Sequence, residues 1–158
     1  MMPNTNLSSQ ILENEHMHRR QNILDFESLL TQMPESFLGD NQNIAPLEHI
    51  FTDGIYVRKI FLPKDFLCTS KIHKKAHPYI ILSGKVAVYT EHEGAQEITG
   101  PFLGITPPMT KRTVFAMEDT IWITFHRTDN IDLKAIEKEI IAPDFRSLEA
   151  EERKELSE

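Results

Sequence analysis

Cysteine is nearly absent from the sequence, with Cys68 alone among 158 residues. One thiol cannot form a disulfide within the chain, so packing and hydrogen bonds have to hold the fold together. Long apolar runs are missing as well, since no stretch approaches the roughly 20 residues that a membrane helix needs. The N-terminus also lacks the basic start, apolar run and small-residue cleavage site of a secretory signal. We therefore expect a cytoplasmic protein.

Basic charge is scarce too. Seventeen Lys and Arg residues stand against 24 Asp and Glu residues, which gives a formal net charge of -7 at pH 7. Such a chain repels nucleic acid phosphates and anionic membranes unless its basic residues are concentrated locally. The sequence offers one modest basic cluster, formed by Lys71, Lys74, Lys75 and Lys85. We expect neither a nucleic acid nor a membrane as a partner.

Several well-known enzyme motifs are absent from the chain. It has no glycine-rich phosphate loop, no GxSxG nucleophile elbow, no CxxC pair and no HExxH helix. The enzyme classes that depend on those motifs therefore lose their main support in the sequence. A chain of 158 residues can bury one hydrophobic core but not two of ordinary size. We expect one domain with appendages.

The domain itself is predicted from the central segment 53–127, which is rich in β-branched and aromatic residues. Turn-forming residues interrupt this segment at spacings of about 8 to 12 residues, which is typical of a β-sandwich or a small barrel. The predicted strands would suit a double-sheet jelly roll. They cover residues 55–62, 66–73, 77–82, 85–91, 95–99, 102–105, 112–117 and 120–126.

Helices are predicted on both sides of the barrel. In the N-terminal arm and loop, 1–52, apolar residues at three- and four-residue spacings predict a helix over about 9–32. A short C-terminal helix is predicted within 128–142, because an aspartate can cap its start and a proline follows its end. The remaining segment, 143–158, is acidic and has few apolar residues, so we expect a mobile tail.

The sequence KIHKKAHPYIILSGK at 71–85 resembles the first motif of the cupin superfamily. In that family a strand with the pattern HxH leads to a second strand with a metal-binding Glu, an apolar run and a glycine. Counted back from Gly84, His77 stands at the Glu position and His73 at the second His, whereas Lys71 replaces the first His. The resemblance covers about half of the chain. It implies an all-β core with the cupin double-stranded β-helix, also called a jelly-roll barrel.

The second cupin motif has the pattern PxGxxH, and its counterpart here is GITPPMTKR at 104–112. Met109 stands at the glycine and Arg112 at the last ligand position, so the usual four-ligand set is altered. The helical arm, the ITPPMTKR turn and TIWITFH at 120–126 also look like small cupin-like proteins of bacteriophages. A phage protein of this kind would work in the host cytoplasm.

A metal site is one interpretation of these histidines. Imidazoles on adjacent strands can converge on one divalent transition metal, and we consider zinc, iron, nickel and manganese. His73 and His77 would be two ligands and His126 the third, while Glu91, Glu97 or water could supply oxygen. The alternative is that His73 and His77 are polar residues at a strand turn, satisfied by backbone groups.

A ligand pocket is predicted beside the histidines. Alternation along a strand places Lys71 on the face of His73. Lys71 and Arg112 would then be two fixed cations, which repel a metal dication and attract a carboxylate or phosphate. Both side chains could instead extend to solvent, and the nearby aromatic rings could be core packing. The residues that we predict to contact a small polar or anionic ligand are Lys71, Tyr79, Arg112 and Trp122.

Three functions remain open at this point. The first is a small-molecule-binding cupin with a degenerate metal site at the barrel mouth. The second is a metal-dependent cupin enzyme, a dioxygenase or an isomerase, which needs a third protein ligand. The third is a structural or assembly protein, for example of a viral particle, whose amphipathic arm docks on a neighbouring subunit. Cupin relatives commonly associate through their sheets, so we also expect a homodimer or a higher symmetric oligomer.

Overall fold

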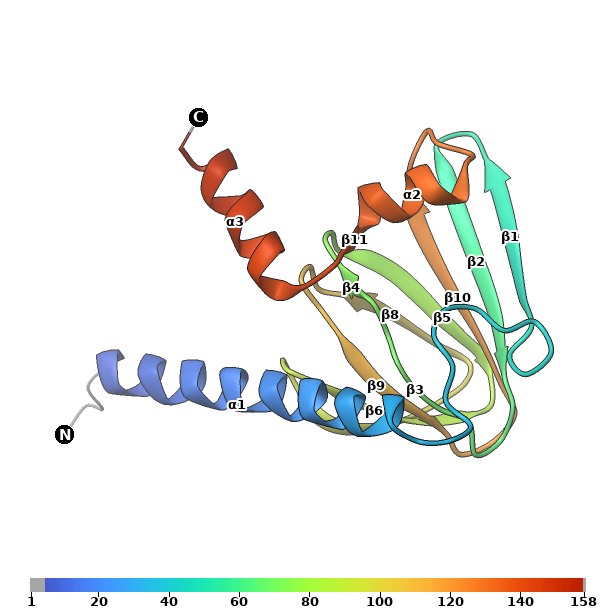
Figure 1. Ribbon diagram of the computed structural model, residues 1–158, viewed down its shortest axis with the longest axis horizontal. Coiled ribbons are helices and arrows are strands. Elements are labelled where there is room, and N and C mark those ends of the chain that lie inside the picture. The colour runs from blue at the N-terminus through green and yellow to red at the C-terminus, as the bar shows by residue number, and fades with distance from the viewer. Residues whose placement is uncertain (1–4, 158) are drawn as a thin grey trace.

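Two antiparallel β-sheets face each other in the computed structural model, which describes residues 5–157 (Figure 1). The strands are β1 (Leu47–Thr52), β2 (Ile55–Leu62), β3 (Leu67–Thr69), β4 (Ile72–His73), β5 (His77–Ser83), β6 (Lys85–Thr90), β7 (Gly94–Thr99), β8 (Phe102–Thr106), β9 (Arg112–Ala116), β10 (Thr120–Arg127) and β11 (Ile141–Ala142). The helices are α1 (Thr5–Thr31), α2 (Leu133–Ile140) and α3 (Phe145–Glu155). The larger sheet has the order β1-β2-β10-β5-β8, the smaller sheet the order β3-β9-β6-β7, and β11 pairs with β4 in a short ribbon.

This architecture confirms the predicted jelly roll with a helical N-terminal arm and a C-terminal helix. The strand predicted over 66–73 is divided into β3 and β4, because the chain departs from the strand at Ser70 and Lys71. There the backbone N–H of Arg112 donates to the hydroxyl of Ser70 at 2.8 Å, and the backbone N–H of Ser70 donates to the carbonyl of Arg112 at 2.8 Å. The strand β1 was not predicted, so the sheet begins before the expected domain boundary at 52/53.

The main core lies between the two sheets. Ile81 on β5, and Val86 and Ala116 on the smaller sheet, have no exposed surface. Every second residue of β6 and β9, and of β5 from His77 to Ile81, is buried, as expected when one face of a strand meets a core and the other does not. Trp122 and Tyr79 belong to this core cluster, which supports the packing alternative for both rings.

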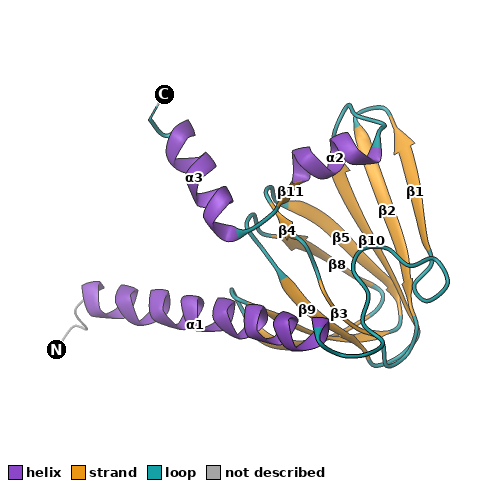
Figure 2. Ribbon diagram, in the orientation of Figure 1, coloured by secondary structure: helices purple, strands orange, loops and turns teal. Residues whose placement is uncertain are grey.

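The helix α1 contacts β3 and β6 of the smaller sheet and extends beyond the sheet at its N-terminal end (Figure 2). Its contacts recur at three- and four-residue spacings, so one face of the helix meets the barrel. Ile23 is 1% exposed, Asn22 donates to the hydroxyl of Tyr89 at 3.2 Å, and Glu27 accepts from Thr69 at 2.7 Å. None of the helices in the described part of the chain is long and apolar enough to cross a membrane.

The C-terminal segment forms two helices where one was predicted. Asp132 caps α2, whose Ile136 and Ile140 pack on Tyr56. Where the sequence predicts a mobile tail over 143–158, the structure instead has α3, with Phe145 and Leu148 buried against β4 and β11. The two apolar residues of this segment lie three apart and share one helix face, so an acidic composition does not prevent packing.

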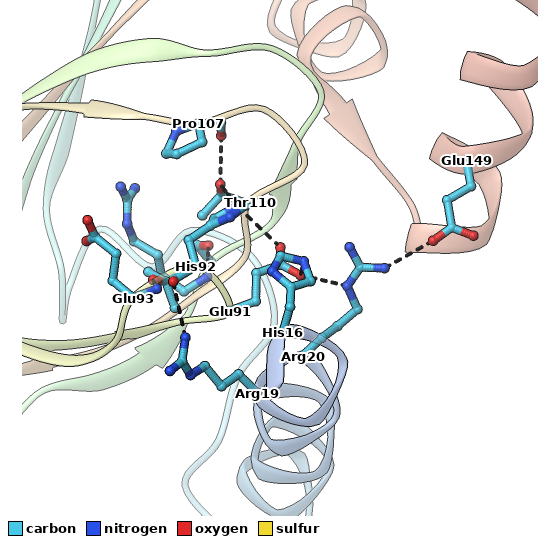
Figure 3. Close-up of polar contacts among 12 residues, drawn as sticks. His16, Arg19, Arg20, Glu91, His92, Glu93, Pro107, Thr110 and Glu149 are labelled. Atoms are coloured by element: carbon cyan, nitrogen blue, oxygen red, sulfur yellow. Dashed lines mark hydrogen bonds and ion pairs between the residues drawn. The ribbon is translucent and has the colours of Figure 1, made fainter. Parts of the chain in front are cut away.

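One buried carboxylate joins α1 and α3 to the barrel (Figure 3). Glu91, in the turn between β6 and β7, has no exposed surface, and its Oε2 lies 2.6 Å from Nε of Arg20 and 3.1 Å from Nε2 of His16. Arg20 also pairs with Glu149 on α3 at 3.0 Å. We call this group the Glu91 cluster.

Candidate metal centre

Three histidines meet at one end of the space between the sheets. His73 ends β4, His77 begins β5, and His126 lies near the end of β10. Their ring centroids are 4.5 Å apart for His73 and His77, 4.4 Å for His77 and His126, and 5.4 Å for His73 and His126. One ligand nitrogen from each ring can be chosen so that all three lie within 4.8 Å of one another. That separation suits coordination of a single ion.

The strand register explains why these rings converge. On β10 the buried residues Trp122 and His126 alternate with partly exposed neighbours, so both face the space between the sheets. His126 pairs with Tyr56 of β2, and the two rings stack at 5.9 Å. The sequence left the face of His126 open, because a shift of one residue in the hairpin before β10 reverses it. The structure turns His126 inward.

The hydrogen bonds of His77 leave one of its nitrogens without a partner. Its Nδ1 lies 3.2 Å from the backbone carbonyl of Lys75. A carbonyl can only accept, so Nδ1 carries the proton and Nε2 keeps its lone pair. Among the described residues this buried Nε2 has no hydrogen-bond partner, and a buried polar atom without a partner is costly unless a ligand or water satisfies it. The free lone pair fits metal coordination.

The environment keeps all three imidazoles neutral. Burial lowers the pKa of His73 to about 2, with further lowering by His77, His126, Arg112 and Arg58. Burial, together with His77 and Arg58, lowers the pKa of His126 to about 3. The pKa of His77 is also lowered, mainly by burial, although the hydrogen bond to Lys75 opposes the shift. Neutral imidazole is the form that binds metals, so the rings are ready as ligands at neutral pH.

Arg112, one of the two cations predicted for the ligand pocket, is buried beside this group. Its guanidinium lies 4.7 Å from the ring centroid of Tyr79 and 5.6 Å from that of Trp122. The side chain forms no hydrogen bond or ion pair with any other residue in 5–157. Burial lowers the pKa of Arg112, partly opposed by Tyr79 and Glu93. Aromatic faces stabilise a buried guanidinium but leave its N–H donors free for an anion.

Lys71 does not join the predicted pocket. It is exposed, and its ammonium forms an ion pair with Glu137 on α2. The prediction assumed an unbroken strand from Thr69 to His73, whereas the break at Ser70 removes the alternation on which it depended. The oxygen ligands considered from the sequence also lie elsewhere, because Glu91 belongs to the Glu91 cluster and Glu97 pairs with Lys85 at 3.0 Å.

Two hydroxyl groups near the histidines were not predicted from the sequence. Thr124, two residues before His126, shares a 3.0 Å hydrogen bond with Nε2 of that ring. Thr106 pairs with His77 across β8 and β5, and its buried hydroxyl oxygen has no partner among the described residues. Alternation from His126 could have identified Thr124. Thr106 could not have been identified, because its position depends on the register between two strands.

A groove of about 620 Å³ opens between β7 and β8 and reaches Tyr79. Glu93 and Gln96 line one side, and Phe102 and Gly104 line the other. Tyr79, whose ring contacts Arg112, is the candidate site residue that lines this groove. The three histidines do not line it.

Comparison with known proteins finds similarity in structure alone. No protein-family model and no curated protein matches the sequence. Solved structures that resemble the chain include an RmlC-like cupin with a double-stranded β-helix fold from Methanocaldococcus jannaschii, at 13% identity and a TM-score of 0.46, covering 60% of this chain and 92% of that one. A cupin superfamily protein from Desulfitobacterium hafniense has 8% identity and a TM-score of 0.47, covering 58% and 84%. KdgF from Halomonas sp. has 12% identity and a TM-score of 0.48, covering 61% and 90%.

The chain folds as a double-sheet jelly roll. Its two antiparallel sheets enclose one core, and the motif positions of His73 and His77 lie together at one end of that core. The third histidine comes from β10. Arg112, at the position expected for the last ligand, contacts the rings of Tyr79 and Trp122. The structure therefore brings His126, which the sequence predicted only as a candidate third ligand, next to the two histidines of the motif.

Proposed function

We propose that this cupin binds one divalent transition metal through His73, His77 and His126, and a small anionic molecule beside it through Arg112. The observation that carries the proposal is the convergence of three neutral imidazoles, with ligand nitrogens within 4.8 Å of one another. Three protein nitrogens leave coordination positions for a further ligand, as in catalytic rather than structural zinc sites. An imidazole-only set favours zinc, iron or nickel over manganese.

Charge explains why a metal and an anion belong together in this site. Three neutral imidazoles leave the full double charge of the ion uncompensated, and Arg112 adds a further positive charge nearby. Positive charges in a poorly solvated space repel each other unless an anion lies between or beside them. A carboxylate or phosphate group could coordinate the metal and accept hydrogen bonds from the guanidinium of Arg112. Tyr79 and Trp122 would hold that guanidinium in place.

Metal content tests the first half of the proposal. Protein purified without a histidine tag should hold close to one equivalent of zinc, iron or nickel by elemental analysis and native mass spectrometry. His77→Ala should lose it, since one of three ligands disappears. His18→Ala is the matched control, because His18 is an exposed histidine on α1. Metal-free protein that also fails to take up added zinc would refute the site.

Arg112 is tested separately with the Co²⁺-loaded protein. Addition of oxalate, a small dicarboxylate probe, should change the visible absorption spectrum of the bound cobalt at low oxalate concentrations. In Arg112→Met the cobalt spectrum recorded without oxalate should be the same as in the wild type. The oxalate concentration that half-saturates the spectral change should rise by at least about tenfold, which corresponds to the loss of one charge-assisted hydrogen bond. Equal oxalate affinity in both proteins would remove Arg112 from the ligand site and leave the metal assignment intact.

A metal-dependent enzyme, a dioxygenase or an isomerase, is the second candidate. The inward position of His126 favours it, because such an enzyme needs three protein ligands and open coordination positions. A molecule that copurifies with the protein can be identified by native mass spectrometry and then incubated with the metal-loaded protein. Conversion of this molecule by the wild type but not by His77→Ala would support the enzyme function. A molecule that is unchanged after prolonged incubation would favour a protein that only binds it.

A further inference from the structure

The hydroxyl of Thr106, the last residue of β8, is a buried polar group that the described chain leaves unsatisfied. The side chain has no exposed surface, and its Oγ1 has no hydrogen-bond partner among the described residues. Two other buried side-chain atoms in 5–157 are in the same state, Nε2 of His77 and Oε1 of Glu91. Because Thr106 and His77 are register partners on β8 and β5, two of these three atoms belong to neighbouring residues at the histidine end of the core.

The side chains of Thr106 and His77 face the space between the sheets. His77 and Tyr79 belong to the buried set of β5, and their partners on β8 are Thr106 and Gly104. The ring of Tyr79 leans over β8, since a Cβ at Gly104 would lie 2.6 Å from it. Directly opposed residues of an antiparallel pair have Cβ atoms about 4.5 to 5.5 Å apart. The hydroxyl of Thr106 is therefore within reach of a small group bound at Nε2 of His77.

The residues that follow Thr106 explain why its hydroxyl finds no partner in the turn. Pro107 and Pro108 come next, and proline has no backbone N–H that could donate to a hydroxyl. The carbonyl of Pro107 accepts from the hydroxyl of Thr110 at 2.7 Å, so it serves the far side of the turn. A hydroxyl has one hydrogen to donate and two lone pairs, and leaving all of them unused in the core is costly. This hydroxyl needs a partner from outside the described chain.

The chemistry at this end of the core favours a partner that accepts hydrogen bonds. The ligand group formed by the described residues consists of histidines alone, and a metal bound there adds positive charge. The guanidinium of Arg112 only donates, and it too lacks a partner within 5–157. An anionic oxygen is the acceptor that suits both Thr106 and Arg112, and hydrogen bonds to a charged oxygen are the stronger kind. A neutral amine would leave the hydroxyl proton without an acceptor.

We infer that the hydroxyl of Thr106 donates a hydrogen bond to an oxygen of the anion that binds the metal beside His77. The inference rests on the proposed function, because it requires both the metal and the anion. Thr106 belongs to the larger sheet and Arg112 to the smaller one, so the two residues hold the anion from opposite sides. Thr106 is then an anion-binding residue that selects for an acceptor oxygen, and its hydroxyl does not stabilise the metal-free fold.

Urea denaturation of the metal-free protein separates this role from a structural one. Thr106→Val keeps nearly the same side-chain shape and removes the hydroxyl. The urea concentration at the midpoint of unfolding should stay unchanged or rise, because the substitution breaks no hydrogen bond of the chain and removes a polar group from the core. A midpoint that falls would show that the hydroxyl is bonded within the folded chain, and it would overturn the inference.

Oxalate titration of the Co²⁺-loaded protein measures the bond to the anion. Without oxalate, the cobalt spectrum of Thr106→Val should be the same as that of the wild type. The oxalate concentration that half-saturates the spectral change should rise by at least about tenfold in this variant, as expected for one hydrogen bond to a charged group. Thr106→Ser keeps the hydroxyl and should titrate like the wild type. So should the matched control Thr113→Val, on the outer side of β9.

The outcomes distinguish this inference from the proposed function. Equal oxalate affinity in Thr106→Val and the wild type would overturn the inference and leave the metal site intact, with the hydroxyl bonded to a buried water molecule instead. A wild-type protein that takes up no cobalt would refute the metal site, and the inference with it. If Thr106→Val does not fold by circular dichroism, Thr106→Ala compared with Thr106→Ser gives the same test, since these two variants also differ by one hydroxyl.

Discussion

Arg20 on α1 donates a hydrogen bond from Nε to Oε2 of Glu91 at 2.6 Å, and the carboxylate has no exposed surface. The same guanidinium lies 4.0 Å above the ring of Phe145 and pairs with Glu149, so this side chain of α1 contacts both the barrel and α3 (Figure 3). The other oxygen of Glu91, Oε1, has no hydrogen-bond partner among the described residues. This buried ion pair therefore links α1 and α3 to the barrel, in addition to the apolar contacts of each helix.

Arg20→Ala should lower the free energy of unfolding by about 3 to 5 kcal/mol, because it leaves the buried Glu91 carboxylate without its cation. Urea denaturation followed by circular dichroism measures this loss. Arg19→Ala is the control, since Arg19 is only partly buried and donates to the carbonyl of His92 at 3.1 Å. It should cost less than about 1 kcal/mol. Equal losses in the two variants would contradict the role of the pair.

Cys68 should react slowly with thiol reagents in the folded protein. Burial raises the pKa of its thiol to about 11, so the reactive thiolate is rare at pH 8. The rate of modification by dithionitrobenzoate should rise as the pH approaches 11, and urea should make it fast at pH 8. An unfolded thiol ionises near pH 8.5, before the folded one, so stability should fall as the pH rises above about 9. Rapid modification of folded protein at pH 8 would contradict this environment.

The sequence predicts the sheets well because their information is local. Alternating apolar residues and turn residues between them recur along 53–127, and each observed strand from β5 to β10 lies within a residue or two of its prediction. The strand β1 was missed because it is an edge strand with many exposed side chains, so it carries no regular alternation of burial. The helix α3 was missed because two buried side chains are too few to outweigh an acidic composition.

The candidate site was predicted less completely because it combines residues whose proximity depends on tertiary structure. His73 and His77 follow from the motif, but the side that His126 faces depends on the register of a hairpin. Lys71 was placed in the pocket by strand alternation, but the strand is interrupted at Ser70 and Lys71. Arg112 was predicted as an anion ligand, while its contacts with Tyr79 and Trp122 require strands from both sheets.

Gly104→Ala should displace Tyr79, because a Cβ at this position would lie 2.6 to 2.7 Å from three atoms of the phenol. Such overpacking costs about 1 to 3 kcal/mol of unfolding free energy, measured by urea denaturation. Tyr79→Leu in the same chain should recover part of this loss, since the shorter side chain vacates the space. If the two substitutions are additive in a double-mutant cycle, the predicted clash does not determine the effect.

Thr124→Val should weaken metal binding by about 10- to 100-fold, if the proposed metal site is correct, because the hydroxyl that orients His126 through a 3.0 Å hydrogen bond is lost. Competition for zinc against a chelator measures the affinity. Thr124→Ser keeps the hydroxyl and should bind zinc with the affinity of the wild type. If the methyl group of Thr124 mattered instead, the serine variant would bind zinc more weakly and the valine variant would bind it normally. Thr113→Val, on the outer side of β9, is the matched control and should bind zinc like the wild type. Unchanged affinity in Thr124→Val would mean that His126 is held by its stacking on Tyr56 and His73, and not by this hydrogen bond.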